Sequence, residues 1–202
     1  MKITMQPPLI LDFDLENRPL SYLGMDFTTS EITAIGYGWA DQEEVAVVRL
    51  EAADMKDDRA YQSAMIQLLE TFRSAYDAAD IITGHYIRNH DLPIINASLI
   101  ELGRAPLKPK MTIDTKNDLV RWKGVSKSQE SLGMMLAHFD NRANLASKEH
   151  MSQDDWRRAN RLTEEGVRET VRRVSGDVHQ HKALRLALVE HGLLKSPRVW
   201  RP

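Results

Sequence analysis

The sequence predicts an α/β domain on one mixed sheet, with three antiparallel strands first, parallel strands next, and helices flanking the sheet. Three observations support this prediction. Short apolar runs near the N-terminus are joined by short links, helices and strands then alternate, and helical spacing dominates the end of the chain. With 202 residues, 42% of them hydrophobic, the chain is long enough for one domain with a substantial core.

Three strands open the predicted sheet. Residues 9–15 form an apolar run in which acidic residues appear towards the end, and residues 32–39 form a second strand. The valine-rich residues 44–50 form a third. Because short links join these strands, we expect an antiparallel meander.

Helices and strands then alternate. Apolar residues recur every three or four positions in residues 61–79, which predicts a helix, and residues 81–83 form a short strand. A second helix, with Pro93 in its first turn, is expected to reach about Gly103. A strand at 110–114 precedes a helix at 128–139, whose apolar face includes Leu132, Met135, Leu136 and Phe139.

The C-terminal part is predicted to be helical, with breaks at glycine. Ser152 marks a helix start, and helical spacing continues beyond it, but Gly166 and Gly176 are expected to bend or interrupt the helix. A last helix is expected over residues 177–191. Residues 1–195 form the expected single domain, and residues 196–202 form a tail that is either a loose end or a packing strap.

Composition limits the class of protein. The chain has no cysteine, which excludes disulfides and cysteine-bound zinc. No apolar stretch is long enough for a membrane helix, and the N-terminus lacks a secretory apolar region, so we expect a cytoplasmic protein that binds no membrane. The net charge of −2 hides an acidic first half and a basic second half. This split fits a metal-binding part beside a part that contacts phosphates, although basic helices also simply face solvent.

An acidic pair follows the first apolar run. Asp14 and Glu16 are two residues apart, so on a strand their side chains share one face. Two such carboxylates repel each other unless a cation lies between them, and Mg²⁺ prefers oxygen ligands. Asp12 is a competing partner for Asp14, but the apolar run before the pair favours Asp14 and Glu16 as a metal anchor.

Two further acids begin predicted helices. Asp91 precedes Leu92-Pro93 after a strand and a polar loop, and Asp177 follows Gly176. Each is also explained as an ordinary residue at a helix start. Loops after strands nevertheless hold many functional sites in α/β proteins, so both remain candidates.

The order and spacing of these segments resemble the DEDD superfamily of 3′–5′ exonucleases over roughly residues 9–193. Four segments carry the resemblance: Asp14-Leu15-Glu16, Gly84-His85-Tyr86 with His90-Asp91-Leu92-Pro93, Thr112-Ile113-Asp114-Thr115, and Gly176-Asp177-Val178. The resemblance implies an RNase H-like fold and a metal-dependent 3′–5′ exonuclease acting on single-stranded nucleic acid, with DNA favoured over RNA. It also implies that two divalent ions, Mg²⁺ or Mn²⁺, are held by Asp14, Glu16, Asp91 and Asp177, the catalytic set.

One departure from this family concerns the residue that orients the attacking water. Active members carry a tyrosine four residues, or a histidine five residues, before the last aspartate, whereas this chain has Arg173 and Arg172 there. A guanidinium stays protonated and is no general base. Candidate water-orienting groups are therefore Lys148, His179 and His181, and the metal ions alone could also activate the water. Arg172 and Arg173 are candidate phosphate-binding groups, as is Lys148.

The substrate expected for such a site is the 3′ end of single-stranded DNA or RNA. Candidate contacts near the second motif are His85, Tyr86, Arg88 and His90, while Trp122 is a further stacking candidate and Trp156 is expected in the core. Two alternatives remain: a catalytically impaired nucleic-acid-binding module, and an RNase H-like endonuclease or ribonuclease. The sequence identifies no replication or repair partner.

Overall fold

The computed structural model describes residues 6–19, 30–120 and 122–202. The first five residues, part of the N-terminus expected to lack a secretory segment, lie outside these ranges. Six strands and five α-helices are seen in the described residues. The strands are β1 (Ile10–Pro19), β2 (Ser30–Trp39), β3 (Ala46–Arg49), β4 (Ile81–Gly84), β5 (Lys110–Asp114) and β6 (Arg198–Trp200). The helices are α1 (Asp58–Ala78), α2 (Asp91–Glu101), α3 (Gln129–Leu136), α4 (Gln153–Asn160) and α5 (Glu164–Glu190), with a 3₁₀ turn, η2, at Ala52–Met55.

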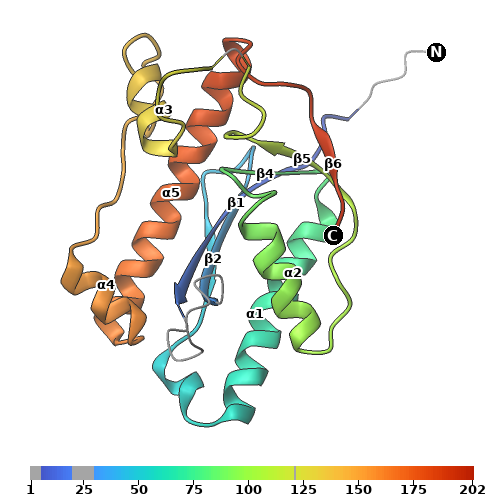
Figure 1. Cartoon of the computed structure of the whole chain (residues 1–202), viewed down its shortest axis with the longest axis vertical. Coiled ribbons are helices and arrows are strands. Elements are labelled where there is room, and N and C mark those ends of the chain that lie inside the picture. The colour runs from blue at the N-terminus through green and yellow to red at the C-terminus, as the bar shows by residue number, and fades with distance from the viewer. Residues whose placement is uncertain (1–5, 20–29, 121) are drawn as a thin grey trace.

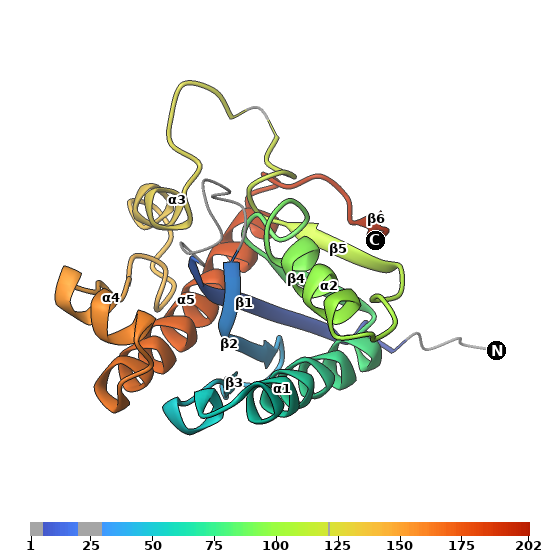
Figure 2. The same cartoon turned by 60° about the horizontal axis from the view of Figure 1, so that its bottom comes forward.

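All six strands form one sheet, in the order β3-β2-β1-β4-β5-β6. β1, β2 and β3 pair antiparallel, whereas β1, β4 and β5 pair parallel. Helices α1 and α2 cover one face, and α5 with α3 and α4 lies on the other (Figures 1 and 2). The predicted mixed sheet with flanking helices is therefore confirmed.

The C-terminal tail adds a strand. β6 pairs antiparallel with β5, with Trp200 opposite Lys110, and Trp200 is buried. Of the two sequence-based alternatives, a loose end and a packing strap, the structure shows the strap, in the form of a sixth strand at the edge of the sheet.

One face of β1 builds the main core. Leu11, Phe13 and Leu15 alternate along the strand and are buried, because side chains two residues apart point to the same face. Phe13 packs against Phe72 of α1, with ring centroids 5.0 Å apart. Burial of such side chains provides most of the driving force that holds α1 on the sheet.

The other face of β1 is acidic and lies against α5. Asp12, Asp14 and Glu16 alternate on this face, opposite the apolar residues. Residues four apart on a helix share one side, so α5 meets the acids with a single row. That row consists of Arg173, Asp177, His181 and Arg185.

Asp12 anchors α5 to the sheet. Arg185 donates two hydrogen bonds of 2.8 Å to its carboxylate, and His181 Nδ1 lies 3.0 Å from Asp12 Oδ1. Burial alone would raise the pKa of Asp12, but these hydrogen bonds outweigh burial and lower the pKa. The acid that competed with the metal pair in the sequence therefore has a structural role.

Helix α5 is continuous, which corrects the predicted break at Gly176. Asp177 thus lies in the middle of a 27-residue helix rather than at its start. Gly176 fits within the helix because the chain before α4 passes close by, and a Cβ at this position would lie 2.8 Å from Cγ of Glu149. The actual interruption falls earlier, between Asn160 and Thr163, where Leu162 has a positive φ of 52°.

Helix α3 is shorter than predicted. It ends at Leu136, and Phe139, expected on the apolar face, is 62% exposed and stacks edge-on against His191. Within the described residues, no helix is both long and apolar enough to cross a membrane.

We expect Asp12→Ala to lower the free energy of unfolding by about 3–5 kcal/mol, because Arg185 would remain buried without its partner. Since the folded pKa of Asp12 is lowered, the stabilisation is present above the ordinary carboxyl pKa and is lost as pH falls through the folded value. Urea denaturation at neutral and acidic pH measures both effects. Asp77→Ala, which breaks an exposed pair with Lys108, is the control and should cost less than about 1 kcal/mol. If Asp12→Ala lowers the free energy of unfolding no more than Asp77→Ala does, Asp12 is not the anchor of α5.

Candidate metal centre

Three carboxylates from β1 and α5 converge beside the sheet. One oxygen each of Asp14, Glu16 and Asp177 lies within 4.8 Å of the others. Strand alternation places the first two on the face that α5 crosses, and α5 provides the third. A register shift between Glu16 and Asn17 of β1 follows the pair, a feature that often re-aims side chains near functional sites. We call these three residues the acidic triad.

Two cationic side chains lie beside the acidic triad. Arg173 Nε donates a 2.7 Å hydrogen bond to Glu16 Oε1, and its Nη2 lies 3.2 Å from Asp177 Oδ2. Lys148 Nζ lies 3.9 Å from Asp177 Oδ1. Of the predicted water-orienting or phosphate-binding residues, the structure places Arg173 and Lys148 at the triad.

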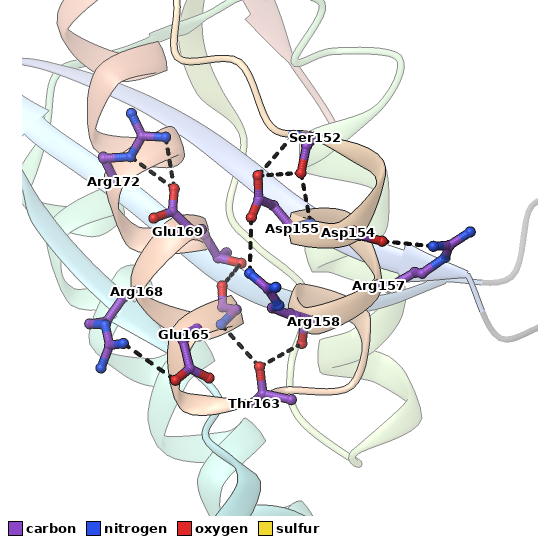
Figure 3. Close-up of polar contacts among 12 residues, drawn as sticks. Ser152, Asp154, Asp155, Arg157, Arg158, Thr163, Glu165, Arg168, Glu169 and Arg172 are labelled. Atoms are coloured by element: carbon purple, nitrogen blue, oxygen red, sulfur yellow. Dashed lines mark hydrogen bonds and ion pairs between the residues drawn. The ribbon is translucent and has the colours of Figure 1, made fainter.

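The remaining candidates of that group lie elsewhere. His181 is buried against Asp12, and His179 lines a separate cavity with Gln42 and Lys182. Arg172 points along the outer surface of α5, where it pairs with Glu169 (Figure 3) and with Glu149. Sequence spacing placed these residues in helical segments on either side of Gly176 but did not indicate which of them face the acids.

Asp91 lines the same cleft. It begins α2, its side chain is buried, and it lines a cleft of about 380 Å³ together with the acidic triad. The group of mutually close oxygens does not include it. Burial, with repulsion from Asp114 and Glu16, raises the pKa of Asp91 to about 7.

The cations beside the triad do not offset all of its negative charge and desolvation. Desolvation, together with repulsion from Asp91, Glu16 and Asp177, raises the pKa of Asp14 well above its ordinary value. Desolvation also raises the pKa values of Glu16 and Asp177, although Arg173 opposes this in both cases. Asp177 Oδ1 is buried and has no hydrogen-bond partner among the described residues. Oxygen donors that share excess negative charge in this way fit a divalent cation such as Mg²⁺ or Mn²⁺.

The loop between β4 and α2 also lines the cleft. Tyr86 and His90 are exposed there, and the ammonium of Lys116 lies 3.8 Å from the centroid of the Tyr86 ring. His85 also lines the cleft, and burial lowers its pKa to about 4, so it is neutral at pH 7. Three of the four predicted nucleic-acid contacts therefore border the cleft.

Arg88, the fourth predicted contact, faces Asp118 and forms an ion pair with this buried carboxylate. The loop itself is held by Asp114, which sequence reasoning did not identify as a scaffold. The Asp114 carboxylate accepts hydrogen bonds from the backbone N–H groups of Tyr86, Arg88, Lys116 and Asn117. The one sequence feature that could have indicated this role is the position of Asp114 at the end of a predicted strand, next to a turn.

Helix α4 covers Arg173 from the outside. Ser152 and Asp155 bond reciprocally at its start, and Arg158 pairs with Asp155 (Figure 3). Trp156, expected in the core, is 36% exposed instead, and its ring centroid lies 5.1 Å from Cζ of Arg173. The other stacking candidate, Trp122, packs against the α3–α5 cluster away from the cleft.

The comparisons with known proteins support the fold. No protein-family model matches the chain, and no curated protein matches it. Among solved structures, the family B DNA polymerase from the hyperthermophilic archaeon Pyrobaculum calidifontis is similar, with a TM-score of 0.58 and 14% identity. The similarity covers 94% of this chain and 25% of the polymerase chain, so this chain spans about a quarter of that protein. It agrees with the expected RNase H-like architecture.

We expect Asp91→Asn to remove a pH dependence of stability. Because the folded pKa of about 7 lies above the ordinary carboxyl value of about 3.9, the folded state keeps a proton that the unfolded state has released. The contribution of Asp91 to the free energy of unfolding therefore decreases as pH rises from about 4 to 7. The variant should gain stability relative to the wild type over this interval, as measured by urea denaturation in EDTA. Asp154→Asn, at an exposed position on α4, is the matched control, and a flat difference for Asp91→Asn would contradict the expectation.

Proposed function

We propose that this chain is a metal-dependent 3′–5′ exonuclease that hydrolyses single-stranded nucleic acid. The observation that supports it is the convergence of Asp14, Glu16 and Asp177 in a cleft, where one buried oxygen of Asp177 accepts no hydrogen bond from the described residues. Phosphodiester hydrolysis is the chemistry that such carboxylates commonly perform with divalent ions. The similar solved structure is a DNA polymerase, which favours DNA over RNA as the substrate.

The acidic triad is the proposed ligand set, with Asp91 in the same cleft. A divalent ion bound there would lower the pKa of a water and neutralise charge on the phosphate. Within the described residues, no histidine or tyrosine pairs with the triad, and His181 is committed to Asp12. The chain's own contribution is therefore to hold the ligands, exclude solvent and supply the positive charges of Arg173 and Lys148.

Three residues that line the cleft, Tyr86, His90 and Lys116, are suited to bind single-stranded nucleic acid. Tyr86 and His90 offer flat surfaces on which bases can stack, and Lys116 offers a charge for a phosphate. Stacking tolerates any base, and these residues line the same cleft as the triad. This arrangement fits an enzyme that shortens a strand from one end without a sequence preference.

A second candidate is a nucleic-acid-binding module that has lost catalysis. The observation that favours it is the place of Arg173, between Glu16 and Asp177. The two candidates differ in whether the chain releases mononucleotides in the presence of a divalent ion.

The direct test is a time course on 5′-labelled single-stranded DNA and RNA with Mg²⁺, Mn²⁺ or EDTA. We expect a ladder that shortens from the 3′ end, depends on metal, and is at least about 100-fold slower in Asp14→Asn and Asp177→Asn, because losing a ligand removes several kcal/mol of charge stabilisation. The control is Asp154→Asn. Tight binding without cleavage would indicate the binding module, and internal oligomers would indicate an endonuclease.

Substitutions of Tyr86 and Lys116 should weaken the binding of the strand rather than slow its hydrolysis. We expect Tyr86→Ala to cost about 1–3 kcal/mol of affinity for a single strand, as for other base-stacking residues. Lys116→Ala should reduce the slope of log affinity against log salt by about 0.7, the value for one phosphate contact. Fluorescence anisotropy in EDTA measures both, with the exposed Lys108→Ala as the control. An unchanged salt slope for Lys116→Ala would place the strand elsewhere.

A further inference from the structure

Arg173 is fixed in place from four directions. Besides Glu16 and Asp177, its Nη1 donates a 3.0 Å hydrogen bond to the carbonyl of Glu149. Trp156 covers its outer face, and the side chain is only 17% exposed. Every nitrogen of the guanidinium therefore has a partner, unlike an arginine that samples solvent.

The guanidinium neutralises only one side of the acidic triad. It contacts Glu16 and the Oδ2 atom of Asp177, whereas Oδ1 of Asp177 has no hydrogen-bond partner among the described residues. Asp14 likewise forms no ion pair with any residue that the structure describes. The ammonium of Lys148 lies 3.9 Å from Oδ1 of Asp177, beyond hydrogen-bond distance. Within the described residues, the carboxylate of the triad without a cationic partner is therefore Asp14, and the oxygen next to it that accepts no hydrogen bond is Asp177 Oδ1.

Charge balance limits how many divalent ions the cleft can accept. The four carboxylates of the cleft, once ionised, carry four negative charges, and Arg173, Lys148 and Lys116 supply three positive charges. One divalent ion therefore already exceeds the remaining negative charge by one. A second would leave a large excess of positive charge in a partly buried site, which is unfavourable unless substrate compensates for it.

We propose that Arg173 holds one of the two cation positions of this site permanently, so that the chain binds a single divalent ion beside Asp14 and Asp177 Oδ1. The inference deepens the proposed function and rests on it for the role of the ion. Arg173 is then the fixed positive charge that faces a bound phosphate, in the place where two-metal enzymes use their second ion.

The test counts Mn²⁺ ions by electron paramagnetic resonance and isothermal titration calorimetry, without substrate. We expect one ion per wild-type chain, with no signal from a spin-coupled pair. Arg173→Met removes the charge but keeps an apolar side chain under Trp156, and it should bind two ions that show spin coupling, since paired sites lie about 3.5–4 Å apart. Arg172→Met, one residue away and paired with Glu169, is the matched control and should bind one ion.

Three results would overturn the inference. A coupled pair of ions in the wild type would show that Arg173 moves aside, and would leave the proposed exonuclease function intact. A single ion in a folded Arg173→Met variant would show that the arginine does not occupy a cation position. No ion in any variant would refute both the inference and the metal-dependent function. Circular dichroism reports whether the variant folds, and Arg173→Gln serves if the methionine variant does not.

Discussion

The neutralisation of one acidic strand face by one helix is the interaction on which the rest of this structure depends. β1 faces the main core with apolar residues and faces α5 with Asp12, Asp14 and Glu16. Carboxylates next to a core are costly unless cations or donors meet them, and α5 provides these through Arg173, His181 and Arg185. The packing of α5 on the sheet is therefore decided by charge as much as by apolar contact.

The carboxylates at the two ends of this acidic face differ in how many hydrogen-bond donors and cations they contact. Asp12 accepts two hydrogen bonds from Arg185 and lies beside His181, and its pKa is lowered. Asp14 has no comparable partner among the described residues, and its pKa is raised. The same alternating pattern thus produces a structural anchor at one end and, at the other, a carboxylate cluster that could hold a metal ion. The contacts of Asp12 with Arg185 and His181 hold α5 in position. The helix therefore does not depend on full neutralisation of the charge around Asp14.

The periodicity of the sequence predicted most of the sheet and grouped Asp14 with Glu16, because a strand fixes which residues share a face. It could not predict that Arg173 would lie between the acids, since that contact joins residues 157 positions apart and depends on side-chain direction. The continuous α5 was missed because glycine usually weakens a helix, whereas here Gly176 allows a neighbouring segment to approach closely. The part played by Asp114 depends on backbone donors, which composition does not reveal.

Because α5 is a continuous helix, insertions and deletions within it should be tolerated less well than substitutions. Each residue of an α-helix turns the chain by about 100°. One residue inserted or deleted between Asp177 and Arg185 would therefore rotate Asp177 out of line with Arg185, which binds Asp12. Point substitutions on the outer surface of this segment leave the angular relation unchanged. Length changes within this stretch of α5 should therefore be far rarer among functional variants than substitutions.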